Sequence, residues 1–141
     1  MSLFDKAGEI GGQFNMAKQI PGKEEFHETI SYFKRQLELK NVEIRLNTVV
    51  NAELISKEKF DEVILATGIK PRTPGIEGID HPKVMSYIDV LLHKKEVGQK
   101  VAVIGAGGIG FDVSEYLTHD FSHPSPTLDL ESWKKEWGIT F

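Results

Sequence analysis

The sequence predicts an α/β fold made of pieces of parallel sheet flanked by helices. Two short apolar runs, residues 63–66 and 101–104, are rich in β-branched side chains, as is typical of strands covered on both faces. Stretches with helical spacing alternate with these runs, and a glycine-rich turn joins the second run to a helix. Strand, glycine turn and helix make half of a βαβ unit. We therefore expect Rossmann-like, three-layer dinucleotide-binding pieces that are incomplete.

The composition is that of an ordinary globular chain. Its 141 residues contain 17 Lys and Arg against 21 Asp and Glu, a formal net charge of −4. This acidic balance predicts no nucleic-acid partner, and the apolar runs are far shorter than the roughly 20 residues that cross a bilayer. The absence of cysteine excludes disulfides, a thiol nucleophile and cysteine-ligated clusters from this chain. The N-terminus lacks a basic stretch leading into an apolar segment, so we expect a cytoplasmic protein.

Residue spacing predicts the elements of the first half. Residues 2–5 end with two apolar residues and an acid before a glycine loop, which indicates the tail of a strand. Residues 42–46 alternate apolar and charged side chains, which predicts a strand, and residues 49–50 predict another short one. Residues 24–39 are expected to be helical because apolar side chains recur four, three and four apart, at Phe26, Ile30, Phe33 and Leu37.

The second half alternates further strand and helix signals. Residues 60–68 predict a buried strand stopped by glycine, and the prolines and glycines of residues 70–78 predict an extended connection. Ser86, followed three residues later by Asp89, is a capping-box variant that opens a short helix through residue 92. After the strand expected at residues 100–104, one helical face is kept by Ile109, Val113, Tyr116 and Leu117.

The last stretch carries aromatic residues and histidines in an aperiodic region. His119 and His123 have metal-ligand spacing for a helix, but the prolines around them predict a loop, so we assign no metal site. Trp133 and Trp137, four apart, predict a helical turn.

The segment Gly105-Ala-Gly-Gly-Ile-Gly110 fits the pattern G-x-G-x-x-G between a predicted strand and a predicted helix. Gly105 allows the tight turn, Gly107 lets a pyrophosphate approach the backbone, and Gly110 brings helix against strand. The helix N-terminus supplies amide N–H groups and positive dipole without a cationic side chain. The alternative interpretation is a turn that only permits close packing.

One part of this nucleotide-binding pattern is missing. An acid that contacts the ribose is expected about 20 residues after the glycines. That position falls near Asp129 or Glu131, which lie in the aperiodic stretch and not at a strand end. We therefore assign neither residue to the ribose.

A second candidate site follows the first predicted strand. Asp5 ends that strand, and a loop containing Gly11 and Gly12 comes next. A carboxylate and backbone amides in this arrangement can bind ribose hydroxyls. An ordinary surface turn is the other interpretation.

Three segments together resemble a known enzyme family. They are Glu-Ile-Gly-Gly-Gln-Phe-Asn-Met-Ala-Lys-Gln-Ile-Pro-Gly-Lys-Glu-Glu-Phe at residues 9–26, Ile-Leu-Ala-Thr-Gly at residues 64–68, and Val-Ala-Val-Ile-Gly-Ala-Gly-Gly-Ile-Gly-Phe-Asp at residues 101–112. They are similar to bacterial NADPH-dependent 2,4-dienoyl-CoA reductase, an old-yellow-enzyme-like flavoprotein family. The similarity also includes residues 78–83 and 136–139.

The resemblance implies a large parent flavoenzyme. Its N-terminal TIM barrel would hold FMN, an iron–sulfur cluster and the acyl-CoA substrate, and its C-terminal region would hold FAD and NADP(H). This chain matches only a middle stretch of that region, without the glycine fingerprint for the FAD pyrophosphate or a strand that reads the NADP 2′-phosphate. The resemblance thus implies that residues 1–97 are a partial FAD-binding domain and residues 98–141 the first strand, turn and helix of an NAD(P)-binding domain with a C-terminal tail. We therefore expect a fragment that binds nucleotide cofactors, depends on the missing domains and does not turn over by itself.

The resemblance also implies roles for individual residues. Asp5 would hold the adenosine ribose of FAD, Gln13 and Lys23 would contact FAD, and Val50 would meet the adenine through its backbone. No residue would be catalytic, and none would bind metal. The glycines expected at the cofactors are Gly11, Gly12, Gly68, Gly105, Gly107, Gly108 and Gly110.

Two other functions are compatible with the same residues. The chain could be the electron-input module of a related old-yellow-enzyme-like or trimethylamine-dehydrogenase-like flavoprotein with another substrate. It could also be a non-catalytic nucleotide-binding module that self-associates, because exposed strand edges favour pairing with another chain.

Overall fold

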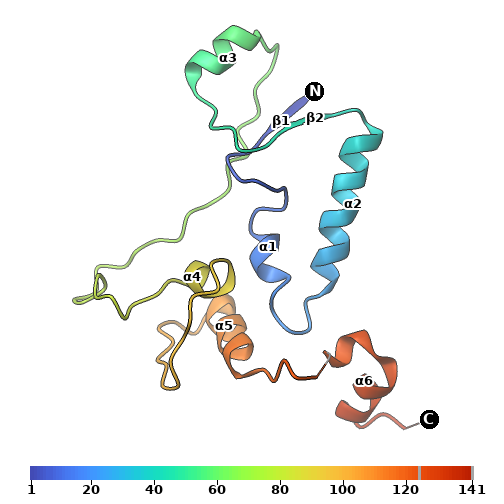
Figure 1. Cartoon of the computed structure of the whole chain (residues 1–141), viewed down its shortest axis with the longest axis vertical. Coiled ribbons are helices and arrows are strands. Elements are labelled where there is room, and N and C mark those ends of the chain that lie inside the picture. Colours follow the sequence, from blue (N-terminus) through green and yellow to red (C-terminus); the bar gives the residue numbers. More distant parts are fainter. Residues whose placement is uncertain (124, 141) are drawn as a thin grey trace. The chain divides into compact units, whose positions relative to one another are not determined.

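The computed structural model describes residues 1–123 and 125–140. The backbone forms two compact units (Figure 1). The first comprises Met1–Gly12 with Thr29–His81, and the second comprises Gln13–Glu28 with Pro82–Phe141. Within the described residues, no helix combines the length and apolar character that crossing a bilayer requires.

The first unit contains a parallel pair of strands and, from Thr29 onward, the helix that lies between them in the sequence. Strand β1 (Ser2–Phe4) leads by way of helix α2 (Glu25–Leu39) to strand β2 (Glu43–Arg45). A parallel pair needs such a crossover, because a short turn cannot return the chain in the same direction. The strand at residues 2–5, the helix at 24–39 and the strand at 42–46 are thus confirmed. The register pairs Ser2 with Glu43, Leu3 with Ile44, and Phe4 with Arg45.

The prediction of a strand at residues 49–50 is wrong. That segment is coil and leads into helix α3 (Ala52–Glu58), which the residue spacing did not predict. Asn51 caps this helix by accepting a hydrogen bond of 2.9 Å from the backbone N–H of Leu54. The available signal was Asn51 as an N-cap with an acid, Glu53, in the first turn.

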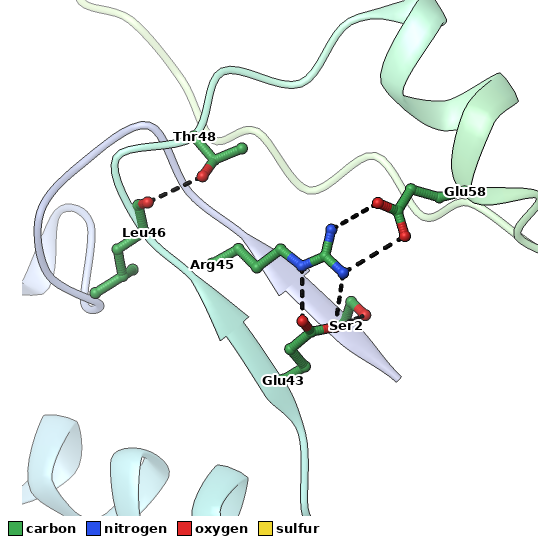
Figure 2. A network of polar contacts seen from close by, with 6 residues as sticks. All are labelled: Ser2, Glu43, Arg45, Leu46, Thr48 and Glu58. Atoms are coloured by element: carbon green, nitrogen blue, oxygen red, sulfur yellow. Dashed lines mark hydrogen bonds and ion pairs between the residues drawn. The ribbon is translucent and has the colours of Figure 1, made fainter.

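Side-chain hydrogen bonds of Arg45 link α3 to the strand pair (Figure 2). Its guanidinium donates to Glu43 at 2.9 Å and to Glu58 at 2.8 Å, and Ser2 donates to Glu43 at 2.9 Å. Hydrogen bonds from Arg45 and Ser2 lower the pKa of Glu43 below its ordinary 4.5. The network therefore stabilises the unit above that pH, and this contribution is lost as the pH falls through the lowered value.

The second unit is helical around a small apolar core. It contains α1 (Phe14–Ala17), α4 (Tyr87–Leu91), α5 (Gly108–Thr118), the 3₁₀ turn η1 (Pro126–Leu128) and α6 (Leu130–Glu136). Its buried apolar residues are Ile20, Val90, Leu91 and Val113.

Three predicted helical elements of this unit are confirmed. Ser86 accepts from the Asp89 N–H at 3.2 Å while Asp89 accepts from the Ser86 N–H at 2.9 Å, which forms the expected capping box of α4. Helix α5 follows the glycine turn, and α6 contains Trp133 and ends one residue before Trp137.

The two buried strands expected at residues 60–68 and 100–104 are not formed. Both segments are coil, and their apolar side chains face solvent: Ile64 is 88% exposed and Ile104 is 81% exposed. A strand exists only where its N–H and C=O groups find a neighbouring strand. Among the described residues, only β1 and β2 pair in this way.

We predict that Ile20→Ala lowers the free energy of unfolding by about 3 kcal/mol, because it removes a fully buried side chain from the core. Ile20 is 1% exposed and packs with Val90, Leu91 and Val113. The matched control Ile64→Ala changes stability by less than about 0.5 kcal/mol, since it deletes an exposed side chain. Urea unfolding followed by circular dichroism measures both. Equal losses in the two variants would contradict this assignment of the core.

Candidate nucleotide-binding site

A glycine turn opens helix α5 in the second unit. Gly105 has φ of 115°, in the left-handed region that favours glycine. Gly107 is the N-cap of α5 with an extended backbone and no side-chain hydrogen bond to the first turn. The first amides of a helix have no intrahelical partner, and no side chain caps them here. They can therefore donate to an anion, with the positive end of the helix dipole behind them.

Two glycines of this turn have different physical roles. A Cβ at Gly110 would collide with the carbonyl oxygen of Gly105, so this position requires glycine for close packing. A Cβ at Gly107 or Gly108 would meet no protein atom within 4 Å. The space beside Gly107 is therefore open for a ligand to approach the backbone. This arrangement leaves room for a pyrophosphate, and the contact of Gly105, Gly107, Gly108 and Gly110 with a nucleotide stays a prediction.

An ion pair joins Lys23 to helix α5 within the same unit. The Lys23 Nζ lies 2.7 Å from both carboxylate oxygens of Asp112, and the two side chains are 38% and 27% exposed. The Lys23 N–H donates to the carbonyl of the fully buried Ile20 at 3.1 Å, which anchors the segment before α2. Residue spacing did not single out Asp112. The available signal was an acid two residues after the last glycine of the motif.

Gln13 is the N-cap of helix α1 in the second unit. Its carbonyl accepts hydrogen bonds of 3.0 Å from the N–H groups of Met16 and Ala17. Its side chain makes no capping hydrogen bond. Its contact with FAD stays a prediction.

The Asp5 loop lies in the first unit at the end of β1. The Asp5 Oδ1 accepts from the Ala7 N–H at 2.9 Å, and the Asp5 N–H donates to the Arg45 carbonyl at 3.1 Å. Gly11 and Gly12 have φ of 120° and 52°, so the loop uses backbone conformations that favour glycine. The carboxylate and the two glycines thus form one surface loop.

Two other predicted contacts belong to the first unit. Val50 follows the segment that is bonded to the Asp5 loop, and its side chain is 40% exposed. Gly68 has φ of 72° in the coil where a strand was expected, and a Cβ there would meet nothing within 4 Å. The hydrogen bonds to the Asp5 loop come from Asn47 and Thr48, shortly before Val50, and Gly68 lies in open space.

The two acids that were not assigned to the ribose have structural contacts. Asp129 caps helix α6 by accepting from the Ser132 N–H at 2.9 Å. Glu131 pairs with Lys134 at 2.9 Å along the same helix.

Comparison with known proteins identifies the family. Residues 3–123 match the family model described as pyridine nucleotide-disulphide oxidoreductase. The chain belongs to this family. Membership implies a Rossmann-like fold that binds FAD and a nicotinamide nucleotide, so the expected α/β fold class is confirmed. This stretch of the pyridine nucleotide-disulphide oxidoreductase contains no cysteine, so it holds no redox disulfide of its own.

Several proteins similar to this oxidoreductase chain are named as reductases. It is 36% identical over 134 residues to bilirubin reductase of Mediterraneibacter gnavus, covering 95% of this chain and 21% of the relative. It is 38% identical over 122 residues to cinnamate reductase of Clostridium sporogenes, covering 83% of this chain and 17% of the relative. A solved 2-naphthoyl-CoA reductase complex superposes with a TM-score of 0.79 at 35% identity, covering 83% of this chain and 18% of that one. The chain spans about a fifth of the length of the relatives it matches.

We predict unequal effects on stability for two glycine substitutions in the turn. Gly110→Ala lowers the free energy of unfolding by about 2 kcal/mol, because its Cβ is forced onto the Gly105 carbonyl. Gly107→Ala changes stability by less than about 0.5 kcal/mol, since its Cβ enters open space at an ordinary φ of −88°. Urea unfolding of both variants measures the difference. If Gly107→Ala lowered the free energy of unfolding as much as Gly110→Ala, the space beside Gly107 would not be open.

Proposed function

We propose that this chain supplies the nucleotide-binding stretch of an NADPH-dependent 2,4-dienoyl-CoA reductase. The open space beside Gly107 at the start of α5 carries the proposal, because it admits a pyrophosphate to free backbone amides. In this assignment residues 1–97 belong to the FAD side and residues 98–141 to the NADPH side. A cytoplasmic location is part of the same proposal.

The glycine turn is the proposed NADPH contact. Gly105, Gly107, Gly108 and Gly110 would place the backbone and the α5 dipole against the pyrophosphate. The nucleotide is held there by amides and not by a cation, because Lys23, the neighbouring ammonium, is paired with Asp112. Asp112 thereby acts as a positioning residue for Lys23, the proposed flavin contact.

The Asp5 loop is the proposed contact for the adenosine of FAD. The Ala7 N–H donates a hydrogen bond to Oδ1 of Asp5. The second carboxylate oxygen can accept a hydrogen bond from a ribose hydroxyl. Gly11 and Gly12 would let the loop backbone approach the cofactor. Val50 would meet the adenine through its backbone, and we include Gln13 and Gly68 as further FAD contacts.

Bound NADPH supplies a hydride to FAD, from which electrons would pass in the parent through an iron–sulfur cluster and FMN to the dienoyl-CoA. The residues of this chain bind and orient the two nucleotides, and none is proposed to give a proton to the substrate. The isolated chain is therefore expected to be inactive. The cluster, FMN and acyl-CoA would lie outside it.

The substrate part of the proposal rests on the resemblance of the three segments. Three of the matched proteins take their names from bilirubin, cinnamate and 2-naphthoyl-CoA, which are all unsaturated compounds. They support a reductase of an unsaturated substrate, and the resemblance adds 2,4-dienoyl-CoA from unsaturated fatty acid β-oxidation. A related old-yellow-enzyme-like or trimethylamine-dehydrogenase-like parent would share this nucleotide-binding stretch and differ in its barrel.

Isothermal titration of the chain with NADPH, NADH and FAD tests the proposal. We expect NADPH to bind, and Gly107→Val to weaken this binding by at least tenfold because its side chain fills the path of the pyrophosphate. FAD binding is expected to be unchanged in the same variant, which serves as the internal control. Failure of wild type to bind any of the three nucleotides would overturn a nucleotide-binding role for this chain.

Self-association is a second candidate function, and the exposed coil segments favour it. Residues 63–66 and 101–104 present apolar side chains and backbone groups that no strand of the described residues pairs. Such segments are templates for pairing with another copy. Light scattering after size exclusion is expected to show an oligomer, and Ile64→Lys with Leu65→Lys to shift it toward monomer. A wild-type chain that stays monomeric at high concentration would exclude this function.

A further inference from the structure

Asn47 turns the chain directly after strand β2. Its φ of 53° lies in the left-handed region, which asparagine tolerates and β-branched residues do not. Three residues later the chain reaches Val50, the proposed adenine contact. The backbone conformation of Asn47 thus sets the direction in which residues 48–50 leave the sheet.

Two consecutive amides after this turn bind the Asp5 loop. The Asn47 N–H donates to the Ala7 carbonyl at 2.9 Å, and the Thr48 N–H donates to the Asp5 carbonyl at 2.9 Å. The Thr48 hydroxyl closes the turn by donating to the Leu46 carbonyl at 2.9 Å, as Figure 2 shows. All of these contacts lie within the first unit. Main-chain hydrogen bonds therefore hold residues 47 and 48, which lead to Val50, against the Asp5 loop.

The Asn47 side chain also lies against the loop. A Cβ built at Gly8 would be 3.3 Å from the Asn47 Oδ1 and 3.9 Å from its Nδ2. The first distance is tighter than most Cβ contacts, so the absence of a side chain at Gly8 lets the amide pack against the loop. Backbone and side chain of Asn47 thus act on the same loop.

From this geometry we infer that Asn47 is a positioning residue that shapes the adenosine end of the FAD site. It sets the proposed ribose contact, Asp5, and the proposed adenine contact, Val50, relative to each other while touching neither the ribose nor the base itself. The inference rests on the proposed function and extends it to a residue outside the glycine motifs. A side chain that resists the left-handed conformation would move residues 48–50 away from the loop.

Three variants separate positioning from general stability. Asn47→Val opposes the left-handed conformation, and Asn47→Gly keeps that conformation but removes the side chain. Asn41→Val is the matched control, because Asn41 has a similar φ of 51° in the same unit but precedes β2, and its backbone N–H donates to the Glu38 carbonyl and not to the Asp5 loop. The measurements are the affinities for FAD and for AMP and the hydrogen exchange of the amides of residues 47 and 48.

We expect Asn47→Val to bind FAD and AMP about tenfold more weakly, and to lose protection of both amides. Asn47→Gly should stay within about twofold to threefold of wild type, since glycine adopts the same backbone conformation freely. Asn41→Val should lower overall stability yet leave affinity and the two protected amides as in wild type. In the Asn47→Gly background, Gly8→Ala should be better tolerated than in wild type, because its Cβ no longer meets the amide.

Nucleotide affinity and amide exchange together decide the positioning role of Asn47. The inference would be overturned if Asn47→Val bound FAD and AMP with wild-type affinity. It would also be overturned if Asn41→Val lost as much affinity as Asn47→Val. If wild type binds neither FAD nor AMP, the proposed function fails, and amide exchange still decides the positioning role. Selective loss of protection in Asn47→Val would then support that role, and equal loss in both variants would reject it. If Asn47→Val does not fold, the coupling between Gly8→Ala and Asn47→Gly serves as the test, and its absence would overturn the inference.

Discussion

Backbone hydrogen bonding between neighbouring strands is the constraint on which this structure depends. Strands β1 and β2 satisfy it for each other, because α2 returns the chain for parallel pairing. Residues 63–66 and 101–104 have suitable side chains for buried strands but have no strand neighbour among the described residues. They remain exposed coil, since side-chain preference alone does not pair N–H and C=O groups. The matched relatives are about five times longer, so strands that would complete these sheets can lie elsewhere in such a polypeptide.

Both candidate cofactor contacts form without a complete sheet because they are local. The glycine turn depends on the approach of Gly110 to the Gly105 carbonyl, five residues earlier. The Asp5 loop depends on an Asx turn to Ala7 and on amides that follow the adjacent strand. Short-range contacts cost little chain entropy to form, in contrast to long-range strand pairing. The glycine turn and the Asp5 loop can therefore form in a chain whose parallel sheets are incomplete.

Side chains distant in the sequence then connect these local pieces within each unit. Lys23 and Asp112 are 89 residues apart and form the ion pair that holds a proposed flavin contact against α5. Arg45 links β2 to α3 through Glu43 and Glu58, and this network steadies the strand from which Asn47 departs. In both cases a charged group keeps part of its exposure. Such pairs position backbone segments more than they stabilise the chain, because solvent screens partly exposed charges.

The sequence by itself determined the fold class, the helices at residues 24–39, 86–92 and beyond Gly107, and the glycine turn. These features depend on periodicity, capping residues and conformations that only glycine adopts, all of which are encoded within a few residues. Only the tertiary structure decided which apolar runs became strands, since pairing requires a neighbour that no local pattern specifies. It also revealed Asp112 and Asn47, whose roles come from partners distant in the chain. The helix α3 was missed for a different reason: its seven residues are too few for periodicity to outweigh the strand-like Val49 and Val50 before it.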